Sequence, residues 1–205
     1  MAGAEKILSQ GQADRTTAVI FVTVGTDEHP FDRLIREVDS LRERGVIREE
    51  VFIQIGFARY HPAHCPFAEI LTYKEMEEKM RDARIVITHG GPGSIMPVLY
   101  SGKVPVVIPR RKRYGEVVDD HQVSFARKLE KEGRIILVEA VEDLGARVEE
   151  YETRAQELTS RIKKDRISPE ANLSRFVRAL EEICLDVVQK RKSRRLKSGG
   201  GKEKE

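Results

Sequence analysis

The segment from Thr88 to Met96, which reads THGGPGSIM, carries the residues best suited to hold an anion. Three glycines, Gly90, Gly91 and Gly93, let a ligand approach the backbone closely and expose N–H groups to it. An apolar run precedes the segment and a predicted helix follows it, and the positive end of such a helix favours phosphate. Ser94 would either cap this helix or donate to a phosphate oxygen. Because glycine turns between a strand and a helix also serve packing alone, phosphate binding is a hypothesis that needs support from the rest of the chain.

A second polar cluster lies between Gly115 and Gln122, which reads GEVVDDHQ and precedes an apolar-periodic helix. Asp and Gln side chains suit sugar hydroxyls because they form paired hydrogen bonds. We therefore consider Asp120, His121 and Gln122 as sugar contacts. The alternative is that Asp119 or Asp120 only caps the helix.

Histidines fall in three predicted loops. His89, in the glycine segment, either contacts a ligand or only shapes the loop. His29 follows the first predicted strand; a histidine titrates near neutral pH, so it is a candidate base, or it has no chemical role. His61, His64 and Cys65 resemble zinc ligands, but no second ligand pair follows at the distance of a structural zinc site. We expect no bound metal.

Four adjacent cations, Arg110 to Arg113, follow Pro109 on a predicted loop. They could favour a diphosphate, face solvent or face lipid headgroups, and the sequence does not choose between these. The Walker pattern, the dinucleotide fingerprint GxGxxG and the GxSxG nucleophile motif are all missing. ATPase, dehydrogenase and serine hydrolase functions therefore lose support.

Strands alternate with helices along the chain, which predicts an α/β fold with a Rossmann-like parallel sheet flanked by helices. The predicted strands are residues 18–24, 51–55, 67–71, 84–88, 104–108 and 134–138, and the predicted helices are 30–44, 74–83, 93–101, a helix within 117–133, 141–164 and 169–191. Ligands bind such sheets at the carboxyl ends of the strands. The loops there, 25–30, 56–66, 89–93 and 109–120, should converge.

The bulk properties predict one main domain. In a chain of 205 residues we expect a flexible lead-in at 1–17, the domain at 18–189 with a helical extension from about 141, and a basic flexible tail at 190–205. The tail carries eight basic and two acidic residues, and the other 189 residues carry 29 basic and 32 acidic ones. This mildly acidic body argues against a nucleic-acid partner. Two distant cysteines and no apolar run of about 18 residues fit a cytoplasmic protein.

Four motifs in this order resemble a known family. They are FVTVGT at 21–26, THGGPGSIM at 88–96, GKVPVVIPR at 102–110 and GEVVDDHQ at 115–122. Together they resemble the C-terminal, nucleotide-sugar-binding half of family 28 glycosyltransferases of the GT-B type. The resemblance covers about residues 19–138. Single-domain members of similar layout are the cytosolic subunit of the two-component dolichol-linked GlcNAc transferase and the PssE-like exopolysaccharide proteins.

The resemblance implies a role for each motif. The loop from His89 to Ser94 would hold the donor diphosphate, and Asp120, His121 and Gln122 would face the donor sugar. Gly25 and Thr26 would border the cleft where the acceptor half closes. The donor would be a UDP-sugar, and no metal or other cofactor would be required.

Two departures from the family pattern matter. Many relatives carry a Glu that holds the ribose three residues after the motif serine, and this chain has Pro97 there. Ribose or phosphate contacts would then come from Arg110, Glu116 or backbone groups. The chain also has room for only one of the two GT-B halves, so the acceptor half would come from a separate, membrane-anchored subunit.

The function expected from these features is that of a donor-binding subunit of a two-component inverting glycosyltransferase. It would move a sugar, GlcNAc as a first guess, from a UDP-sugar to a lipid-linked acceptor, and would be cytoplasmic and peripheral to the membrane through its partner. The alternative is a non-catalytic subunit that binds a nucleotide-sugar or enhances a partner transferase. An apolar stripe at Phe176, Leu180, Ile183, Val187 and Val188 would either dock that partner or pack on the sheet.

Overall fold

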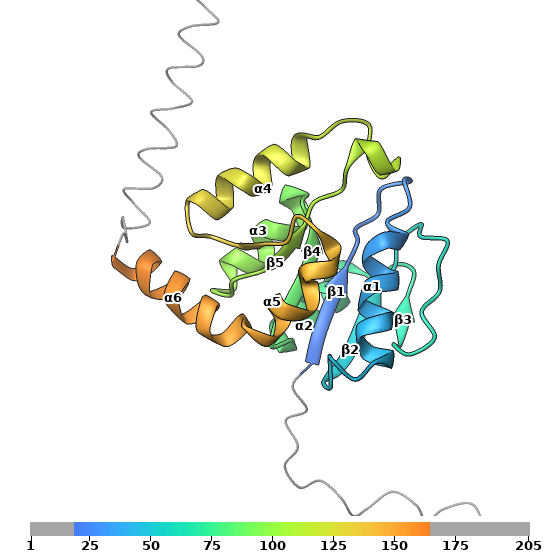
Figure 1. Cartoon of the computed structure of the whole chain (residues 1–205), viewed down its shortest axis with the longest axis horizontal. Coiled ribbons are helices and arrows are strands. Elements are labelled where there is room, and N and C mark those ends of the chain that lie inside the picture. The colour runs from blue at the N-terminus through green and yellow to red at the C-terminus, as the bar shows by residue number, and fades with distance from the viewer. Residues whose placement is uncertain (1–18, 165–205) are drawn as a thin grey trace, which may run out of the picture. The chain divides into compact units, whose positions relative to one another are not determined.

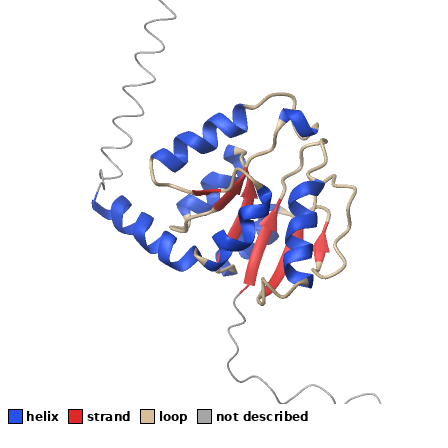
Figure 2. Ribbon diagram, in the orientation of Figure 1, coloured by secondary structure: helices blue, strands red, loops and turns tan. Residues whose placement is uncertain are grey.

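The computed structural model describes residues 19–164, which form a six-stranded parallel sheet with helices on both faces (Figures 1 and 2). The strand order is β3-β2-β1-β4-β5-β6, and every described strand pair is parallel. The strands are β1 (Val19–Thr23), β2 (Glu50–Gln54), β3 (Phe67–Ala68), β4 (Ile85–His89), β5 (Val106–Ile108) and β6 (Ile136–Leu137). The Rossmann-like α/β prediction is confirmed.

The helices cover the sheet in two layers. The α-helices are α1 (Asp32–Glu43), α2 (Tyr73–Asp82), α3 (Pro92–Tyr100), α4 (His121–Lys131), α5 (Leu144–Glu149) and α6 (Tyr151–Lys164), and two short 3₁₀ turns are η1 (Lys112–Tyr114) and η2 (Val141–Asp143). Helices α1 and α5 pack on one face, and α2, α3 and α4 pack on the other.

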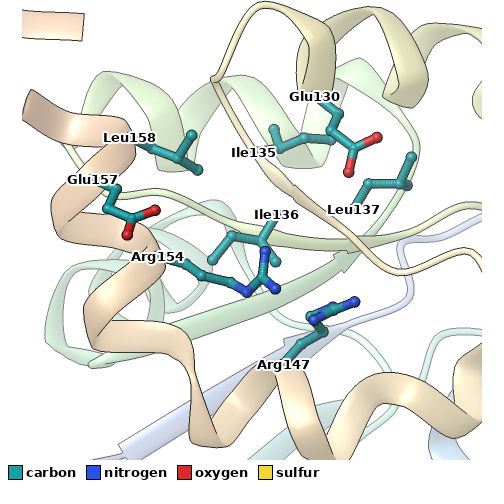
Figure 3. Close-up of a pocket in the computed structure, with 8 residues that line it drawn as sticks. All are labelled: Glu130, Ile135, Ile136, Leu137, Arg147, Arg154, Glu157 and Leu158. Carbon is teal, nitrogen blue, oxygen red and sulfur yellow. The ribbon is translucent and has the colours of Figure 1, made fainter. Parts of the chain in front are cut away.

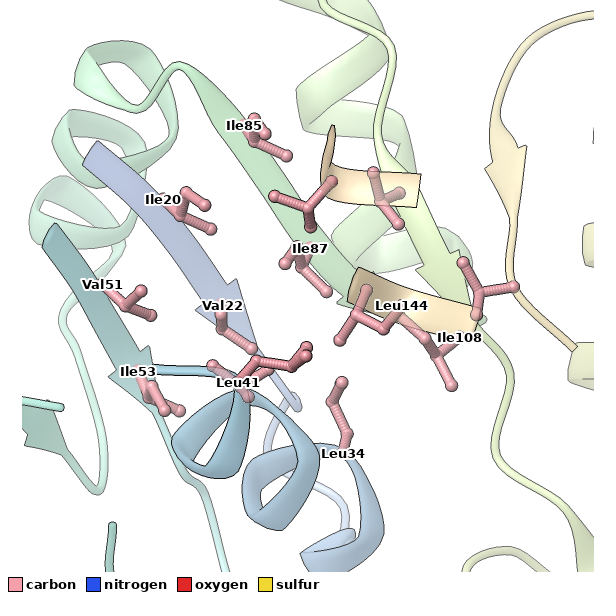
Figure 4. Packing of buried hydrophobic residues seen from close by; sticks show 14 of the residues in the cluster. Ile20, Val22, Leu34, Leu41, Val51, Ile53, Ile85, Ile87, Ile108 and Leu144 are labelled. Carbon is pink, nitrogen blue, oxygen red and sulfur yellow. The ribbon is translucent and has the colours of Figure 1, made fainter. Parts of the chain in front are cut away.

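Alternation along the central strands explains the two layers. In β1, Ile20 and Val22 point to the face covered by α1, whereas Phe21 points to the face covered by α2 and α3. Figure 4 shows the first of these faces, where Leu34 of α1 and Leu144 of α5 meet the strands. Side chains of this kind each contribute about 1.5–3 kcal/mol when buried, so strands that are apolar on both sides belong at the centre of a parallel sheet.

Side-chain hydrogen bonds stabilise both ends of α2. Thr72 caps its first turn, accepting from the Glu75 amide while Glu75 accepts from the Thr72 amide, which is a reciprocal capping box. At the other end, the Lys103 ammonium donates to the carbonyls of Met80, Arg81 and Ala83. Lys103, which lies between α3 and β5, therefore stabilises the C-terminal end of α2.

The structure differs from the sequence prediction at several elements. Strands β3 and β6 are shorter than expected. The helix predicted over 141–164 is divided into η2, α5 and α6, because Glu150 ends α5 and Tyr151 turns inward, where its hydroxyl donates to the Val104 carbonyl at 3.0 Å. Helix α3 begins at Pro92, one residue earlier than predicted, with Gly91 as its N-cap.

Several predictions lie outside the described residues. They are the lead-in at 1–17, the helix at 169–191 with its apolar stripe, and the tail at 190–205. Within residues 19–164, no helix is long and apolar enough to cross a membrane.

Candidate functional site

The glycine segment joins β4 to α3 at the carboxyl edge of the sheet, as predicted. Pro92 takes the first helical position, where its missing N–H costs nothing. Gly93 follows it in the first turn, where amides have no acceptor one turn earlier. Ser94 does not cap the helix, so that alternative is wrong. Its Oγ lies instead 2.9 Å from Nε2 of His89.

His89 is held in one tautomer by its two contacts. Its Nδ1 accepts from the Gly91 amide at 3.0 Å, so the ring proton lies on Nε2, which donates to the Ser94 Oγ. The hydroxyl hydrogen of Ser94 is then left for a further acceptor. The pKa of His89 is lowered to about 4, mainly because the ring is buried and secondly because the positive charge of Arg110 is near. The ring is therefore neutral at pH 7, and it shapes the loop.

The glycines of this edge are needed because side chains crowd them. A Cβ on Gly91 would lie 2.3 Å from Cε1 of His89, and one on Gly25 would lie 2.6 Å from Nε2 of the same ring. Gly25 also has a φ of +78°, which other residues rarely adopt. A Cβ on Gly93 would meet nothing within 4 Å. The loops after β1 and β4 therefore touch through His89, while Gly93 faces open space.

Two buried polar residues that the sequence reading missed hold the loop after β1. Gln54, at the end of β2, accepts from the Gly25 amide at 3.1 Å and donates to the Gly25 carbonyl at 3.1 Å. Thr23 donates its hydroxyl proton to the Gln54 Oε1 at 2.7 Å. The signal available in the sequence was a Thr and a Gln inside otherwise apolar strands, since such buried polar groups need partners.

The cluster before α4 is partly buried and partly open. Gln122 is buried: its Oε1 accepts from the Arg110 amide at 3.3 Å, and its side chain lies against Gly90. Asp120 stands at the N-cap position of α4 but makes no capping bond, and it accepts instead from the Lys112 amide at 2.9 Å. Asp119 accepts from both the amide and Nδ1 of His121. Asp120 and His121 are exposed, whereas Gln122 of the predicted sugar-facing trio lies against Gly90 of the glycine loop.

His29 forms a pair with Asp27 in the loop after β1. The Asp27 Oδ1 lies 2.7 Å from the His29 Nδ1 and accepts from the His29 amide at 2.9 Å. Burial acts to raise the pKa of Asp27, but the His29 hydrogen bonds and the Arg110 charge outweigh it and lower that pKa. The His29 side chain is partly exposed. Thr26 is exposed beside this pair.

Arg110 and Glu116 are buried, being 1% and 3% exposed. The Glu116 carboxylate accepts from the Arg33 guanidinium and from the Arg111 amide, so its oxygens are engaged inside the protein. Arg111 pairs with Glu139, and only Lys112 and Arg113 of the four cations are exposed. This geometry favours a role for Arg110 and Glu116 in holding loops together, rather than the predicted role of contacting ribose or phosphate.

The suspected zinc residues take part in a different arrangement. Asp39 of α1 accepts from the amides of Ala63 and His64 and from the Tyr60 hydroxyl, and it fixes the loop after β2. Burial raises the pKa of the Cys65 thiol to about 12, whereas a metal ligand must be a thiolate. Within residues 19–164, no group of three His, Cys, Asp or Glu is placed to hold a metal ion.

A pocket of about 280 Å³ lies between β6 and α6 (Figure 3). Its lining residues are Glu130, Ile135, Ile136, Leu137, Arg147, Arg154, Glu157 and Leu158. Helix α4 begins at the carboxyl edge of the sheet, and Glu130 lies near its far end. The pocket is therefore remote from the glycine loop.

A Rossmann-like domain with a glycine loop between a strand and a helix is an arrangement that binds nucleotides. Residues 19–182 match the model of the glycosyltransferase family 28 C-terminal domain, and the chain belongs to that family. The chain is similar to the UDP-N-acetylglucosamine transferase subunit ALG13 of Homo sapiens, with 34% identity over 127 residues, which cover 57% of this chain and 10% of that protein. It is 26% identical over 141 residues to ALG13 of Yarrowia lipolytica, covering 63% of this chain and 69% of that protein.

Solved glycosyltransferases share the fold at low sequence identity. SnogD from Streptomyces nogalater has a TM-score of 0.51 and 17% identity, covering 87% of this chain and 48% of SnogD. CalG4, the calicheamicin glycosyltransferase, has a TM-score of 0.54 and 16% identity, covering 76% of this chain and 39% of CalG4. The chain thus spans about a tenth of the length of its human relative and less than half of either solved structure.

Proposed function

We propose that this chain is the donor-binding subunit of a two-subunit glycosyltransferase that uses UDP-N-acetylglucosamine and a lipid-linked acceptor. The observation that carries the proposal is the His89–Ser94 pair at the start of α3. It leaves a hydroxyl proton beside the exposed Gly93, at the positive end of a helix. The family membership and the printed function of the ALG13 relatives support the choice of donor.

In this proposal the first turn of α3 binds the donor diphosphate. The Ser94 hydroxyl and the Gly93 amide donate to phosphate oxygens, and the helix dipole offsets the charge that grows on UDP as it leaves. These groups act without a metal ion, so donor binding should persist in EDTA. Gln122 keeps the loop in place through Gly90, and the exposed side chains of Asp120 and His121 meet the sugar.

His29 is the proposed base for the transfer. With its Nδ1–H donated to Asp27, the Nε2 is free to take the proton of the acceptor hydroxyl. The acceptor oxygen then bonds to the anomeric carbon on the face opposite the diphosphate, the bond from that carbon to UDP breaks, and the product is inverted. Asp27 stabilises the imidazolium that forms.

A separate, membrane-anchored subunit completes the enzyme in this proposal and holds the lipid-linked acceptor. The support is that the ALG13 relatives are named as subunits of a UDP-N-acetylglucosamine transferase. The chain would be cytoplasmic and would reach the membrane through that subunit. The second candidate is a donor-binding subunit that only stabilises its partner, which the departure at Pro97 favours.

Titration of the chain with UDP by calorimetry, with and without EDTA, tests the proposal. Removing a hydrogen bond to a charged group costs about 1.5–3 kcal/mol, so Ser94→Ala should weaken UDP binding by about 10–100-fold. Ser124→Ala is the matched control, because Ser124 is exposed on α4. Equal UDP affinities of the two variants, or no UDP binding by the natural chain, would contradict the proposed site.

A further inference from the structure

The Arg110 side chain joins two loops at the carboxyl edge of the sheet, the loop after β1 and its own loop after β5. Its guanidinium donates to the Val24 carbonyl at the end of β1 (2.8 Å), to the Glu116 carbonyl before α4 (3.0 Å) and to the His29 carbonyl before α1. The Val24 and His29 carbonyls belong to the loop after β1, 86 and 81 residues before Arg110, and the Glu116 carbonyl belongs to the same loop as Arg110. A single side chain therefore fixes the spacing of two loops that come from distant parts of the chain.

The guanidinium forms no salt bridge within residues 19–164, although the carboxylates of Asp27 and Glu116 are near enough to act on its charge. Among the described residues, no carboxylate oxygen lies within 4.0 Å of it, since Glu116 is taken up by Arg33. Within residues 19–164 its Nε has no hydrogen-bond partner, and its closest aromatic contact is Phe31, with the ring centroid 5.0 Å from Cζ. Burial lowers the pKa of Arg110, which means that the protein bears a cost for keeping a cation there.

The same residue is linked to the glycine loop. Its amide donates to Gln122, whose side chain lies against Gly90, and its charge is the second cause of the low pKa of His89. Arg110 is 1% exposed, so a ligand on the loop surface does not reach it. Its influence on such a ligand must pass through the residues that it holds and through its electric field.

We propose that Arg110 is a positioning residue for the donor site, which holds the loop of His29 against the loop that leads to Gln122 and places a buried positive charge without a salt bridge behind the bound diphosphate. This inference rests on the proposed function for the identity of the ligand. It explains why a buried cation is retained where three carbonyls satisfy only part of its hydrogen-bonding capacity. It also gives Arg110 a different role from Lys112 and Arg113, which are exposed to solvent.

Lysine cannot replace Arg110 in this role. The planar guanidinium directs donors toward carbonyls on different sides, whereas an ammonium group is a single point of charge on a flexible stem. Arg110→Lys therefore keeps the charge and loses the geometry, and Arg110→Met loses both. Arg113→Lys serves as the matched control, because Arg113 is exposed in the same loop.

Two measurements on the full chain test the inference. The first follows the ring nitrogens of His89 by NMR from pH 7 to pH 4. We expect the neutral Nε2–H tautomer throughout most of this range in the natural chain and in Arg113→Lys. In Arg110→Met the ring should protonate at a higher pH. The second is UDP titration, where we expect binding about tenfold weaker in Arg110→Lys, weaker still in Arg110→Met and unchanged in Arg113→Lys.

A purely structural role gives a different result and would overturn the inference: both Arg110 variants would melt at lower temperature, while the folded protein kept the His89 titration and the UDP affinity of the natural chain. If the natural chain does not bind UDP, the proposed function fails, and the His89 titration alone decides whether Arg110 positions the loop. If Arg110→Met does not fold, Arg110→Lys and the natural chain decide. Ordinary titration of His89 near pH 6.5 in the natural chain contradicts the inference.

Discussion

At the level of single residues, Gly91 and Gly93 differ in what surrounds them, although they are two positions apart. A methyl group on Gly91 would lie within 2.3 Å of the His89 ring, whereas one on Gly93 would meet nothing within 4 Å. We therefore expect Gly91→Ala to displace His89 from Ser94 and to lower the free energy of unfolding by about 1–3 kcal/mol. Gly93→Ala should leave stability unchanged or raise it by up to about 1 kcal/mol.

Urea unfolding of the two variants, beside the natural chain, measures this difference. UDP affinity should fall in both: in Gly91→Ala because Ser94 loses its partner, and in Gly93→Ala because the methyl crowds the approach to the amide. Equal stability losses in the two variants would show that the loop is not organised around His89.

Single residues also show where sequence reasoning stopped. The glycine segment and its place at a strand end were predictable, because glycine content and apolar runs are local properties. The burial of Arg110 and Glu116 was not, because a run of cations is usually solvated and only the tertiary contacts with Val24, His29 and Arg33 reverse that expectation. Gln54 was overlooked for the same reason, since its partner Gly25 is 29 residues away.

At the level of elements, α2 depends on a residue outside it. Lys103 donates to the carbonyls of Met80, Arg81 and Ala83, which are acceptors that the end of the helix leaves without helical partners. Lys103→Met keeps the length of the side chain and removes these bonds. We expect a loss of about 1–3 kcal/mol in the free energy of unfolding, measured by urea denaturation.

Lys131→Met is the control for this prediction, because Lys131 is exposed in the last turn of α4 and should cost less than about 0.5 kcal/mol. Hydrogen exchange gives a second readout: the last amides of α2 should exchange faster in Lys103→Met alone. Equal behaviour of the two variants would mean that the Lys103 contacts add nothing to the stability of α2.

The elements themselves were mostly predictable, and their errors have a common cause. Strands such as β1 and β4 are buried on both faces, so they read as continuous apolar runs. The division of the expected helix at 141–164 was not visible, because it depends on Tyr151 reaching the Val104 carbonyl, a contact across 47 residues. Helical periodicity continues through that point and carries no signal of the turn.

At the level of the whole molecule, residues 19–164 form one Rossmann-like domain, whereas the proposed reaction needs two substrates held face to face. UDP should therefore bind to the isolated chain, and at a concentration of 100 Kd it should add about 2.7 kcal/mol of stability, which raises Tm by about 5–10 °C. Sugar transfer to a lipid-linked acceptor should be absent from the isolated chain and appear when an acceptor-binding subunit is added.

His29 connects this molecular prediction to its residues. In the assembled enzyme, His29→Gln should reduce kcat by about 10²–10⁴-fold, because the acceptor hydroxyl loses its base, while UDP affinity stays within about twofold. Glu28→Gln, an exposed neighbour in the same loop, should change neither quantity. Transfer by the isolated chain would remove the need for a partner. Full activity of His29→Gln would contradict the assignment of His29 as the base. The base would then have to come from the partner subunit, while the donor site stays on this chain.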